Sequence, residues 1–463
     1  MYNQNHIKKI LHFVGIGGIG MSGIAEIMHN EGYIIQGSDI AMNYNAQRLI
    51  DLGVKVFIGH NADNVEGADY VVLSSAIPSD NIEVIQAKQQ HIPILTRAEV
   101  LAELMRLKTS IAVSGSHGKT TTTSLVASIF EKAGIHPTVI NGGIINGKMT
   151  NAYLGRSEYL IAEADESDAT FINIPATIAV ITNIDVEHLD FYHNFDNILA
   201  AFERFILNLP FYGFAVLCID NVHCARLAEK ITNRKIITYS IENEGANIFA
   251  YNIRCGYEKS IFDVKITLPS HKGHTIIENI AIPILGIHNV SNALAAISIA
   301  AELNFGIHTM QKAFENFKGV KRRFTKVCEY NGATIIDDYA HHPAEITAVI
   351  NTAKLFSEAN NSKIMVFFQP HRYSRFKDLY QDFLKVFNDV EYLFVLPIYA
   401  SGENVIEGIS SQNFIKDITH KHAQYIEDIE DIQKQIKLYA QPSDMILFLG
   451  AGNISFMANN LKL

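Results

Sequence analysis

Cysteine, positive charge and long apolar runs are all scarce in this sequence. The 463 residues include four cysteines, and no two of them have C-x-x-C spacing, which excludes a disulfide framework and fits a reducing compartment. No stretch approaches the roughly 20 apolar residues of a membrane span, and no signal peptide with a small-residue cleavage site is apparent. We therefore expect a cytoplasmic protein with no membrane partner.

The chain carries 38 Lys and Arg against 48 Asp and Glu, a net charge of −10. Such a protein lacks a generic attraction to nucleic acid, so no nucleic-acid partner is expected, and phosphorylated ligands must be held by local groups. Hydrophobic residues make up 48% and charged residues 19%, as in globular proteins. At roughly 150 residues per domain, this length predicts three domains.

We place these domains at residues 1–107, 108–322 and 323–463. Short apolar runs alternate with helical periodicity in all three, which is typical of α/β folds with parallel sheets. Between residues 246 and 285 alternating apolar residues predict an antiparallel insertion in the central domain. The predicted strands lie at 10–14, 33–36, 54–58, 70–73, 92–95, 110–113, 159–163, 178–183, 334–337, 363–368, 392–396 and 445–449. The predicted helices include 21–30, 120–132 and 289–303.

The first of two glycine-rich turns is Gly15-Ile16-Gly17-Gly18-Ile19-Gly20, between a predicted strand and a predicted helix. Its glycines let the backbone approach a pyrophosphate that lies on the helix N-terminus. Asp39 ends the next strand and fits either a ribose contact or a helix cap. The usual ligand of such a turn is NAD.

The second turn, Gly115-Ser116-His117-Gly118-Lys119-Thr120-Thr121, has the form of a P-loop. Backbone amides and Lys119 would hold phosphates, and a Thr hydroxyl would ligate Mg²⁺. Val113 stands where the strict pattern has its first glycine.

Together the two turns argue against a simple dehydrogenase, because hydride transfer needs no triphosphate site. A reaction that couples ATP to a second, pyrophosphate-bearing substrate needs both, so the sequence favours a ligase or a kinase. We expect a Rossmann-like first domain, a P-loop ATPase-like α/β central domain and a Rossmann-like third domain.

Carboxylates follow two strands of the central domain, at residues 163–168 and 185–190. Mg²⁺ prefers such oxygen ligands beside a P-loop, and Glu163 is the first choice. His288, Asn289 and Asn292 open a predicted helix, where they can cap its N-terminus or read a base edge.

Two polar segments of the third domain, residues 337–345 and 369–375, directly follow predicted strands. Ligand sites of open α/β sheets lie at such strand ends. Arg372 and Arg375 are three residues apart and can clamp a carboxylate or a phosphate.

Taken together, these motifs closely resemble those of the Mur ligases of peptidoglycan synthesis, over almost the whole chain. The segment after His188 has no lysine of the kind that some sister ligases carbamylate, which agrees with the alanine-adding branch. Ala340 and Ala344 depart from the pattern, since Gly and Thr are expected there.

The resemblance implies domains for a UDP-sugar, for ATP and for an amino acid, in that order. Its implied catalytic residues are Lys119, Glu163, His188, Arg372 and Arg375. The UDP-sugar would be bound by Gly15, Gly17, Gly18, Gly20 and Asp39. ATP would be bound by Gly115, Ser116, His117, Gly118, Lys119, Thr120, Thr121, His288, Asn289, Asn292, Arg323 and Asp338. Mg²⁺ or Mn²⁺ would be bound by Thr120, Glu163 and His188, and the amino acid and muramyl carboxylate by Tyr339, His341, Arg372 and Arg375.

The implied reaction joins L-alanine to the lactyl carboxylate of UDP-N-acetylmuramate through an acyl phosphate, giving UDP-N-acetylmuramoyl-L-alanine, ADP and phosphate. Three alternatives stay open. A recycling ligase would attach a whole tripeptide, although residues 368–373 speak against it. An NAD-dependent oxidoreductase would depend on the first glycine turn and Asp39 alone. The third alternative is a non-catalytic, nucleotide-dependent binding module.

Overall fold

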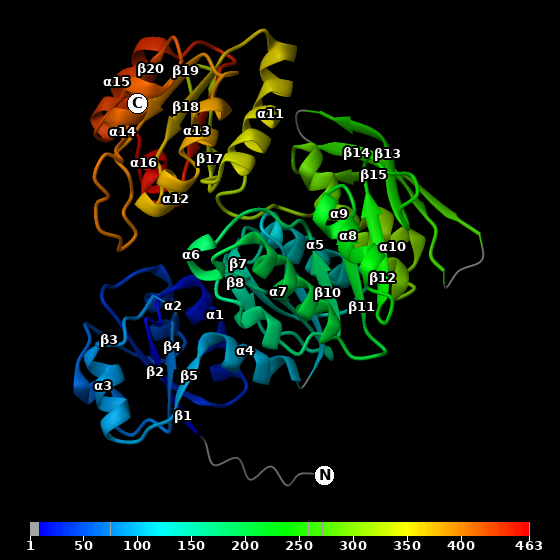
Figure 1. Cartoon of the computed structure of the whole chain (residues 1–463), viewed down its shortest axis with the longest axis vertical. Helices are drawn as coiled ribbons and strands as arrows, with labels where there is room; N and C mark the ends of the chain where they lie inside the picture. Colours follow the sequence, from blue (N-terminus) through cyan, green and yellow to red (C-terminus); the bar gives the residue numbers. More distant parts are fainter. Residues whose placement is uncertain (1–8, 75, 107, 257–258, 270–272, 463) are drawn as a thin grey trace. The chain divides into compact units, whose positions relative to one another are not determined.

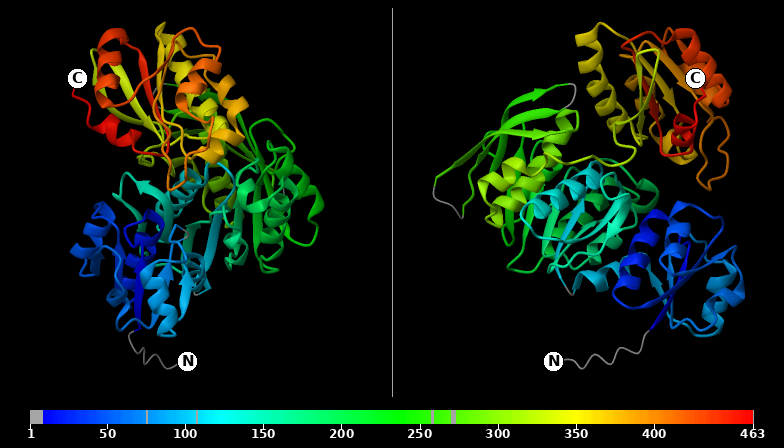
Figure 2. Two further views of the ribbon diagram at one scale, coloured as in Figure 1. Left: turned by 60° about the vertical axis from the view of Figure 1, so that its left-hand side comes forward. Right: turned by 180° about the vertical axis from the view of Figure 1, so that it is seen from behind.

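The computed structural model describes residues 9–74, 76–106, 108–256, 259–269 and 273–462. They divide into two compact units. The first holds the described parts of residues 1–251, 263–280 and 291–318, and the second holds those of residues 252–262, 281–290 and 319–463. Within the described ranges three β-sheets form the framework (Figures 1 and 2), and no helix there combines the length and the apolar character needed for a bilayer crossing.

The first sheet is entirely parallel and has the order β3-β2-β1-β4-β5. Its strands are β1 (Ile10–Val14), β2 (Ile34–Asp39), β3 (Lys55–Ile58), β4 (Tyr70–Leu73) and β5 (Ile94–Thr96). Its helices are α1 (Ile19–Asn30), α2 (Tyr44–Asp51), the 3₁₀ turn η1 (Ala62–Val65), α3 (Ile82–Gln89) and α4 (Arg97–Arg106). The strand order reverses between β1 and β4, and ligands of open parallel sheets bind at such a switch point.

The second sheet has the order β15-β14-β13-β12-β11-β10-β6-β9-β7-β8. In chain order, the first five strands of this sheet are β6 (Thr109–Ser114), β7 (Thr138–Ile145), β8 (Thr150–Tyr153), β9 (Tyr159–Glu163) and β10 (Ile178–Ile181). The others are β11 (Phe214–Cys218), β12 (Lys235–Ser240), β13 (Ile248–Cys255), β14 (Ser260–Ile266) and β15 (Thr275–Ile282). The helical elements of this region are α5 (Lys119–Lys132), η2 (Thr170–Asn173), α6 (Leu189–Tyr192), α7 (Phe195–Leu207), α8 (Val222–Lys230), α9 (Ile287–Glu302) and α10 (Ile307–Lys312).

Strand β6 lies between β9 and β10 and is parallel to both. The loop that follows β6 therefore emerges beside the carboxyl ends of its two neighbours. The predicted insertion forms β13, β14 and β15, which are consecutive neighbours at one edge of the sheet.

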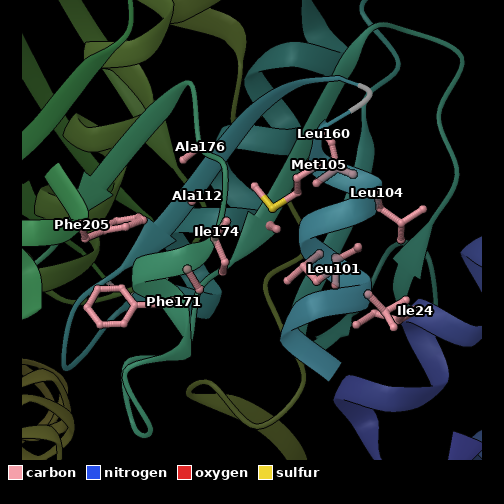
Figure 3. Close-up of a cluster of buried hydrophobic side chains, with 14 of the residues drawn as sticks. Ile24, Leu101, Leu104, Met105, Ala112, Leu160, Phe171, Ile174, Ala176 and Phe205 are labelled. Atoms are coloured by element: carbon pink, nitrogen blue, oxygen red, sulfur yellow. The ribbon is translucent and has the colours of Figure 1, made fainter. Parts of the chain in front are cut away.

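Helix α4 belongs to the same hydrophobic core as the central strands of the first unit. Figure 3 shows Leu101 and Met105 of this helix with Ile24 of α1, Leu160 of β9 and Phe171 of η2. Met105, Ile24 and Leu160 are fully buried, and each such side chain contributes on the order of 2 kcal/mol of hydrophobic free energy. This packing fixes the start of β6, which follows α4 directly.

The third sheet lies in the second unit and has the order β16-β17-β21-β18-β19-β20. Only its edge pair β16–β17 is antiparallel; the other neighbours are parallel. The strands are β16 (Thr325–Tyr330), β17 (Ala333–Asp338), β18 (Ile364–Phe368), β19 (Tyr392–Val395), β20 (Ala423–Tyr425) and β21 (Met445–Leu449). The helices are α11 (Pro343–Asn360), α12 (Tyr373–Asp378), α13 (Tyr380–Val386), α14 (Ser411–Asp417), α15 (Ile429–Tyr439) and α16 (Ile454–Asn459).

The predicted α/β class and the predicted strands are confirmed, and β1, β4, β9 and β21 have the bounds that their apolar runs indicate. The sequence pattern does not predict β7, in which Gly142 and Gly143 interrupt the apolar residues, and the apolar run of β11 is left unassigned. The predicted domain boundaries stay a prediction, since the first compact unit joins the first predicted domain to most, but not all, of the second.

Candidate active site

The second glycine turn joins β6 to α5 and has a backbone that only glycine accommodates. Gly115 has a φ of +126°, and a Cβ added to it would lie 2.2 Å from the Thr182 Oγ1. Gly118 has a φ of +83°, and an added Cβ would lie 2.6 Å from the Asn292 Oδ1. The first-turn N–H groups of a helix have no intrahelical acceptor and bind anions well. The turn therefore presents the start of α5 to a phosphate.

Asn183, just beyond β10, holds this turn from the side. Its carbonyl oxygen accepts the Ser116 N–H at 3.0 Å, and its Oδ1 accepts the His117 N–H at 2.8 Å. Asn292 of α9 contributes as well, because its Oδ1 accepts the Thr122 hydroxyl at 3.2 Å. The structure thus places Asn292 beside the P-loop, and its nucleotide-binding role stays a prediction.

Lys119 folds back over the turn. Its Nζ donates to the carbonyl oxygens of Gly115 at 2.6 Å and Ser116 at 3.0 Å, and to the Glu166 Oε1 at 2.9 Å. Burial alone lowers the pKa of Lys119, but the Glu166 and Asp165 carboxylates outweigh it and raise this pKa above its ordinary value. The ammonium is therefore charged at neutral pH, as a phosphate ligand must be.

Glu166 is a central residue of this site that the sequence analysis does not select. Its side chain is 3% exposed, and it contacts both Lys119 and the His188 Nε2, which lies 3.6 Å from its Oε1. The Tyr192 hydroxyl donates to its backbone oxygen at 2.5 Å. The only sequence signal is its membership of the acidic segment 163–168, where Glu163 is the preferred candidate.

Glu163 ends β9, and its Oε2 accepts the Gly142 N–H at 2.8 Å. Ligand atoms of Glu166, Glu187 and His188 lie within 4.8 Å of one another. Carboxylate oxygens with one imidazole suit Mg²⁺ or Mn²⁺, so the residues present fit a divalent cation. His188 also has a φ of +54°, a strained conformation that is common in functional sites.

The first glycine turn follows β1 at the switch point of its sheet. The N–H groups of Gly15 and Ile16 donate to the Ser38 carbonyl oxygen at 2.8 and 2.9 Å. Asp39 accepts the Gly17 N–H through its Oδ2 at 2.9 Å. A Cβ on Gly17 would lie 2.5 Å from the Asn43 Nδ2. Asp39 therefore braces the turn in this structure, and its ribose role stays a prediction.

Arg97, the first residue of α4, is a second residue that the sequence analysis does not select. Its Nη1 lies 3.2 Å from the place of a Cβ on Gly20, and its Nη2 lies 3.7 Å from the Asp165 Oδ2. It therefore links the first glycine turn to the acidic segment after β9. Its position directly after β5, at a strand end, is the signal that could have identified it.

In the second unit, His288 and Asn289 make contacts local to the start of α9. The Asn289 side chain donates to the Leu285 carbonyl oxygen at 2.6 Å and lies 3.1 Å from the His288 Nε2. Burial lowers the pKa of His288 to about 4, so the ring is neutral at pH 7. In neither of these two contacts does Asn289 accept a helix N–H, so they do not show a capping role, and adenine recognition stays a prediction.

Asp338 ends β17 and is nearly fully buried. Its two oxygens accept the N–H groups of Phe324 at 2.6 Å and Ala340 at 2.7 Å. Burial raises the pKa of this carboxyl to about 6, although Arg323 opposes the shift. The Arg323 and Arg322 guanidinium groups lie over the Tyr339 ring, at 5.5 and 4.7 Å from its centroid.

The predicted amino-acid residues gather where β17 and β18 end, on either side of β21. The His341 ring contacts the rings of Tyr339 and His371 edge to face, at 5.3 and 5.8 Å between centroids. The Arg375 Nη1 lies 3.4 Å from the His371 Nδ1. Burial lowers the pKa of His341 to about 3 and that of His371 to about 4. The arginines thus stand beside neutral imidazoles and are free of charge repulsion from them.

A P-loop between parallel strands, a carboxylate cluster beside its lysine and a second glycine turn at a sheet switch point define a nucleotide-dependent α/β enzyme. The comparisons identify its family. Three family models match the chain: the Mur ligase family catalytic domain at residues 10–109, the Mur ligase middle domain at 113–300 and the Mur ligase glutamate ligase domain at 322–452.

Relatives confirm this match along the whole chain. The UDP-N-acetylmuramate–L-alanine ligase of Rickettsia felis is 58% identical over 461 residues, covering 99% of this chain and 96% of the relative; that of Rickettsia bellii is 57% identical with the same coverage. The chain belongs to the Mur ligase family, and it is an ATP-dependent, amide-bond-forming ligase. This membership removes the oxidoreductase alternative.

Two solved structures agree with the fold. The UDP-N-acetylmuramate–alanine ligase of Thermotoga maritima has a TM-score of 0.80 at 29% identity, covering 97% of each chain. A murein peptide ligase of Psychrobacter arcticus has a TM-score of 0.72 at 20% identity, covering 98% of this chain and 100% of the other. The second similarity shows the fold alone.

Proposed function

We propose that this enzyme joins L-alanine to the lactyl carboxylate of UDP-N-acetylmuramate, while ATP is converted to ADP and phosphate. The observation that carries the proposal is the 57–58% identity, across 99% of the chain, to ligases named for this reaction. Two separate phosphate-binding turns support it, because one can bind ATP and the other the UDP-sugar.

In this proposal the turn of residues 115–121 holds the ATP phosphates. The lactyl carboxylate attacks the γ-phosphate, and the charge that develops is stabilised by Lys119 and the amides at the start of α5. Lys119 now donates to Glu166 and to two turn carbonyls, so it exchanges one of these partners for a phosphate oxygen. The adenine of ATP is bound by His288, Asn289 and Asn292. Its phosphates are bound by Arg323 and its ribose by Asp338.

Thr120, Glu163 and His188 would hold Mg²⁺ or Mn²⁺, and Glu166 and Glu187 lie next to His188. When bound, the cation would neutralise phosphate charge. The chain's own contribution is to hold Glu163 in place through the Gly142 N–H.

Gly15, Gly17, Gly18 and Gly20 bind the UDP-sugar pyrophosphate in this proposal, with Asp39 at the ribose. Tyr339, His341, Arg372 and Arg375 bind alanine and the muramyl carboxylate. The alanine amine then attacks the acyl phosphate carbonyl, the amide bond forms and inorganic phosphate leaves.

The test incubates the enzyme with UDP-N-acetylmuramate, ATP, Mg²⁺ and each of the twenty amino acids, and weighs the products by mass spectrometry. We expect the alanyl product to form with L-alanine. Equal turnover with the free tripeptide L-alanyl-γ-D-glutamyl-diaminopimelate would instead indicate the recycling ligase, and absence of any product would indicate the binding module.

A matched pair of α5 variants tests the ATP-binding turn. Lys119→Ala should lower product formation by at least about 10³-fold, because it removes a charge aimed at the transferred phosphate. Lys132→Ala, at the other end of the same helix and part of a loose 3.9 Å ion pair with Glu315, should leave the rate within about twofold. An active Lys119→Ala enzyme would contradict the proposed role.

A further inference from the structure

The segment after β19 lies alongside the segment that leaves β18. The Tyr399 N–H donates to the Pro370 carbonyl oxygen at 2.8 Å, and the Arg372 N–H donates to the Tyr399 carbonyl oxygen at 2.9 Å. The His371 and Tyr399 rings stack at 5.5 Å with an angle of 9°. The second segment is therefore built onto the backbone that carries the predicted arginines.

Arg372 is held in an unusual conformation there. Its φ is +69°, which is uncommon and strained for a residue with a Cβ. The bond from its N–H to Tyr399 helps to maintain that backbone. Strain at such a position is typical of sites where a side chain must point in one direction.

Glu403, from the same segment, fixes the side chain. Its Oε1 accepts the Arg372 Nε–H at 2.7 Å and the Ser374 hydroxyl at 2.6 Å, and its Oε2 accepts the Ser374 N–H at 2.9 Å. Burial raises the pKa of Glu403, but the bonds from Ser374 and Arg372 outweigh it and hold this pKa below its ordinary value. Glu403 is therefore a charged acceptor of three hydrogen bonds.

The guanidinium nitrogen that Glu403 occupies determines which N–H groups of Arg372 remain for a ligand. A guanidinium has one N–H on Nε and four on its two terminal nitrogens, and the terminal pair matches a carboxylate bidentately. Glu403 engages Nε. A carboxylate that is hydrogen-bonded to Nε orients the plane of the guanidinium. The two terminal nitrogens then remain to bind a second carboxylate.

We propose that Glu403 is a positioning residue that aims the terminal nitrogens of Arg372 at a substrate carboxylate. This inference rests on the proposed function, in which Arg372 binds the carboxylate of alanine or of the muramyl group. Alanine and the muramyl group each carry a carboxylate. Kinetic measurements with both substrates therefore show which of the two carboxylates Arg372 binds.

The first measurement compares Glu403→Gln with Glu407→Gln, an exposed residue four positions along the same segment. Glu403→Gln should lower kcat/KM for alanine or for UDP-N-acetylmuramate by roughly tenfold to a hundredfold, the range expected for loss of a charged hydrogen bond. Its KM for ATP should change by less than about twofold. Glu407→Gln should have wild-type kinetic constants for all three substrates.

A double-mutant cycle with Arg372→Lys separates positioning from a structural effect. If Glu403 acts through Arg372, adding Glu403→Gln to Arg372→Lys should cost less than about twofold more. Ser374→Ala, which leaves the Arg372 contact in place, should cost less than about threefold. Three results would each overturn the inference. These are multiplicative losses of kcat/KM in the double variant, a rise in the KM for ATP as large as the effect on the other substrates, and a Glu403→Gln enzyme with wild-type kinetics. A wild type that forms no product would instead refute the proposed function.

Discussion

Glu83, in the first unit, carries a prediction about stability that the structure makes quantitative. The carboxylate is fully buried and gathers partners from three other segments: His12 of β1 at 3.2 Å, Ser38 of β2 at 2.5 Å and Asn64 of η1 at 2.6 Å. Ser38 is also the residue whose carbonyl oxygen holds Gly15 and Ile16. Glu83 therefore supports the first glycine turn from behind.

The size of the effect follows from the pKa of Glu83. Burial alone would raise it, but the hydrogen bonds from His12, Ser38 and Asn64 lower it to about 2, from an ordinary value of 4.5. At 1.36 kcal/mol per pKa unit, this difference corresponds to about 3 kcal/mol of folding free energy at pH 7. Glutamine resembles the protonated acid, so Glu83→Gln should lose about that amount.

Thermal unfolding provides the assay. For a unit of this size about 3 kcal/mol lowers Tm by about 5 °C. Because the folded pKa is the lower one, the contribution is complete above about pH 5 and is lost as the pH falls toward 2. The Tm difference between wild type and Glu83→Gln should therefore narrow below pH 5.

Glu103→Gln is the control, since Glu103 is exposed and pairs with Arg106 one helical turn away. It should shift Tm by no more than about 1 °C. A Glu83→Gln protein that melts with the wild type, or a difference that is the same at pH 3 and pH 7, would show that the buried carboxylate does not stabilise the fold in this way.

Two further predictions concern the proposed ATP site. Gly115→Ala should raise the KM for ATP at least about tenfold in initial-rate measurements, because its Cβ would meet Thr182. Gly134→Ala is the control: Gly134 also has a positive φ but has open space around it, so this variant should leave the KM for ATP unchanged. Equal KM values for the two variants would contradict the steric argument. Glu163→Gln should raise the Mg²⁺ concentration for half-maximal rate at least about tenfold in a titration at saturating ATP, whereas an unaltered Mg²⁺ dependence would remove Glu163 from the metal site.

Much of the fold was predictable because its information is local. Buried parallel strands are short apolar runs, and β9 and β21 begin and end where those runs do. The two glycine turns are equally local, since a strand, a positive-φ glycine and a helix start follow one another within a few residues. The same is true of the strand-end segments that contain Asp338, Arg372 and Arg375.

The partners of those residues were not predictable in the same way. Glu166 meets Lys119 across 47 residues of chain, and Glu403 meets Arg372 across 31. In the sequence Glu166 is one of several acidic residues in a row, and Glu403 lies in a polar segment between β19 and α14. Nothing local marks either as a partner of a basic side chain.

The sequence by itself therefore determined the α/β class, the two glycine turns between strand and helix and the family, because each depends on residues that are neighbours in the chain. The tertiary structure alone decided which carboxylate approaches Lys119, that Arg97 links the first turn to the acidic segment, and that Glu83 and Glu403 accept hydrogen bonds from residues distant in the chain. Those contacts form only when β-strands distant in sequence are brought side by side, since the ends of adjacent strands then place their side chains within hydrogen-bonding distance.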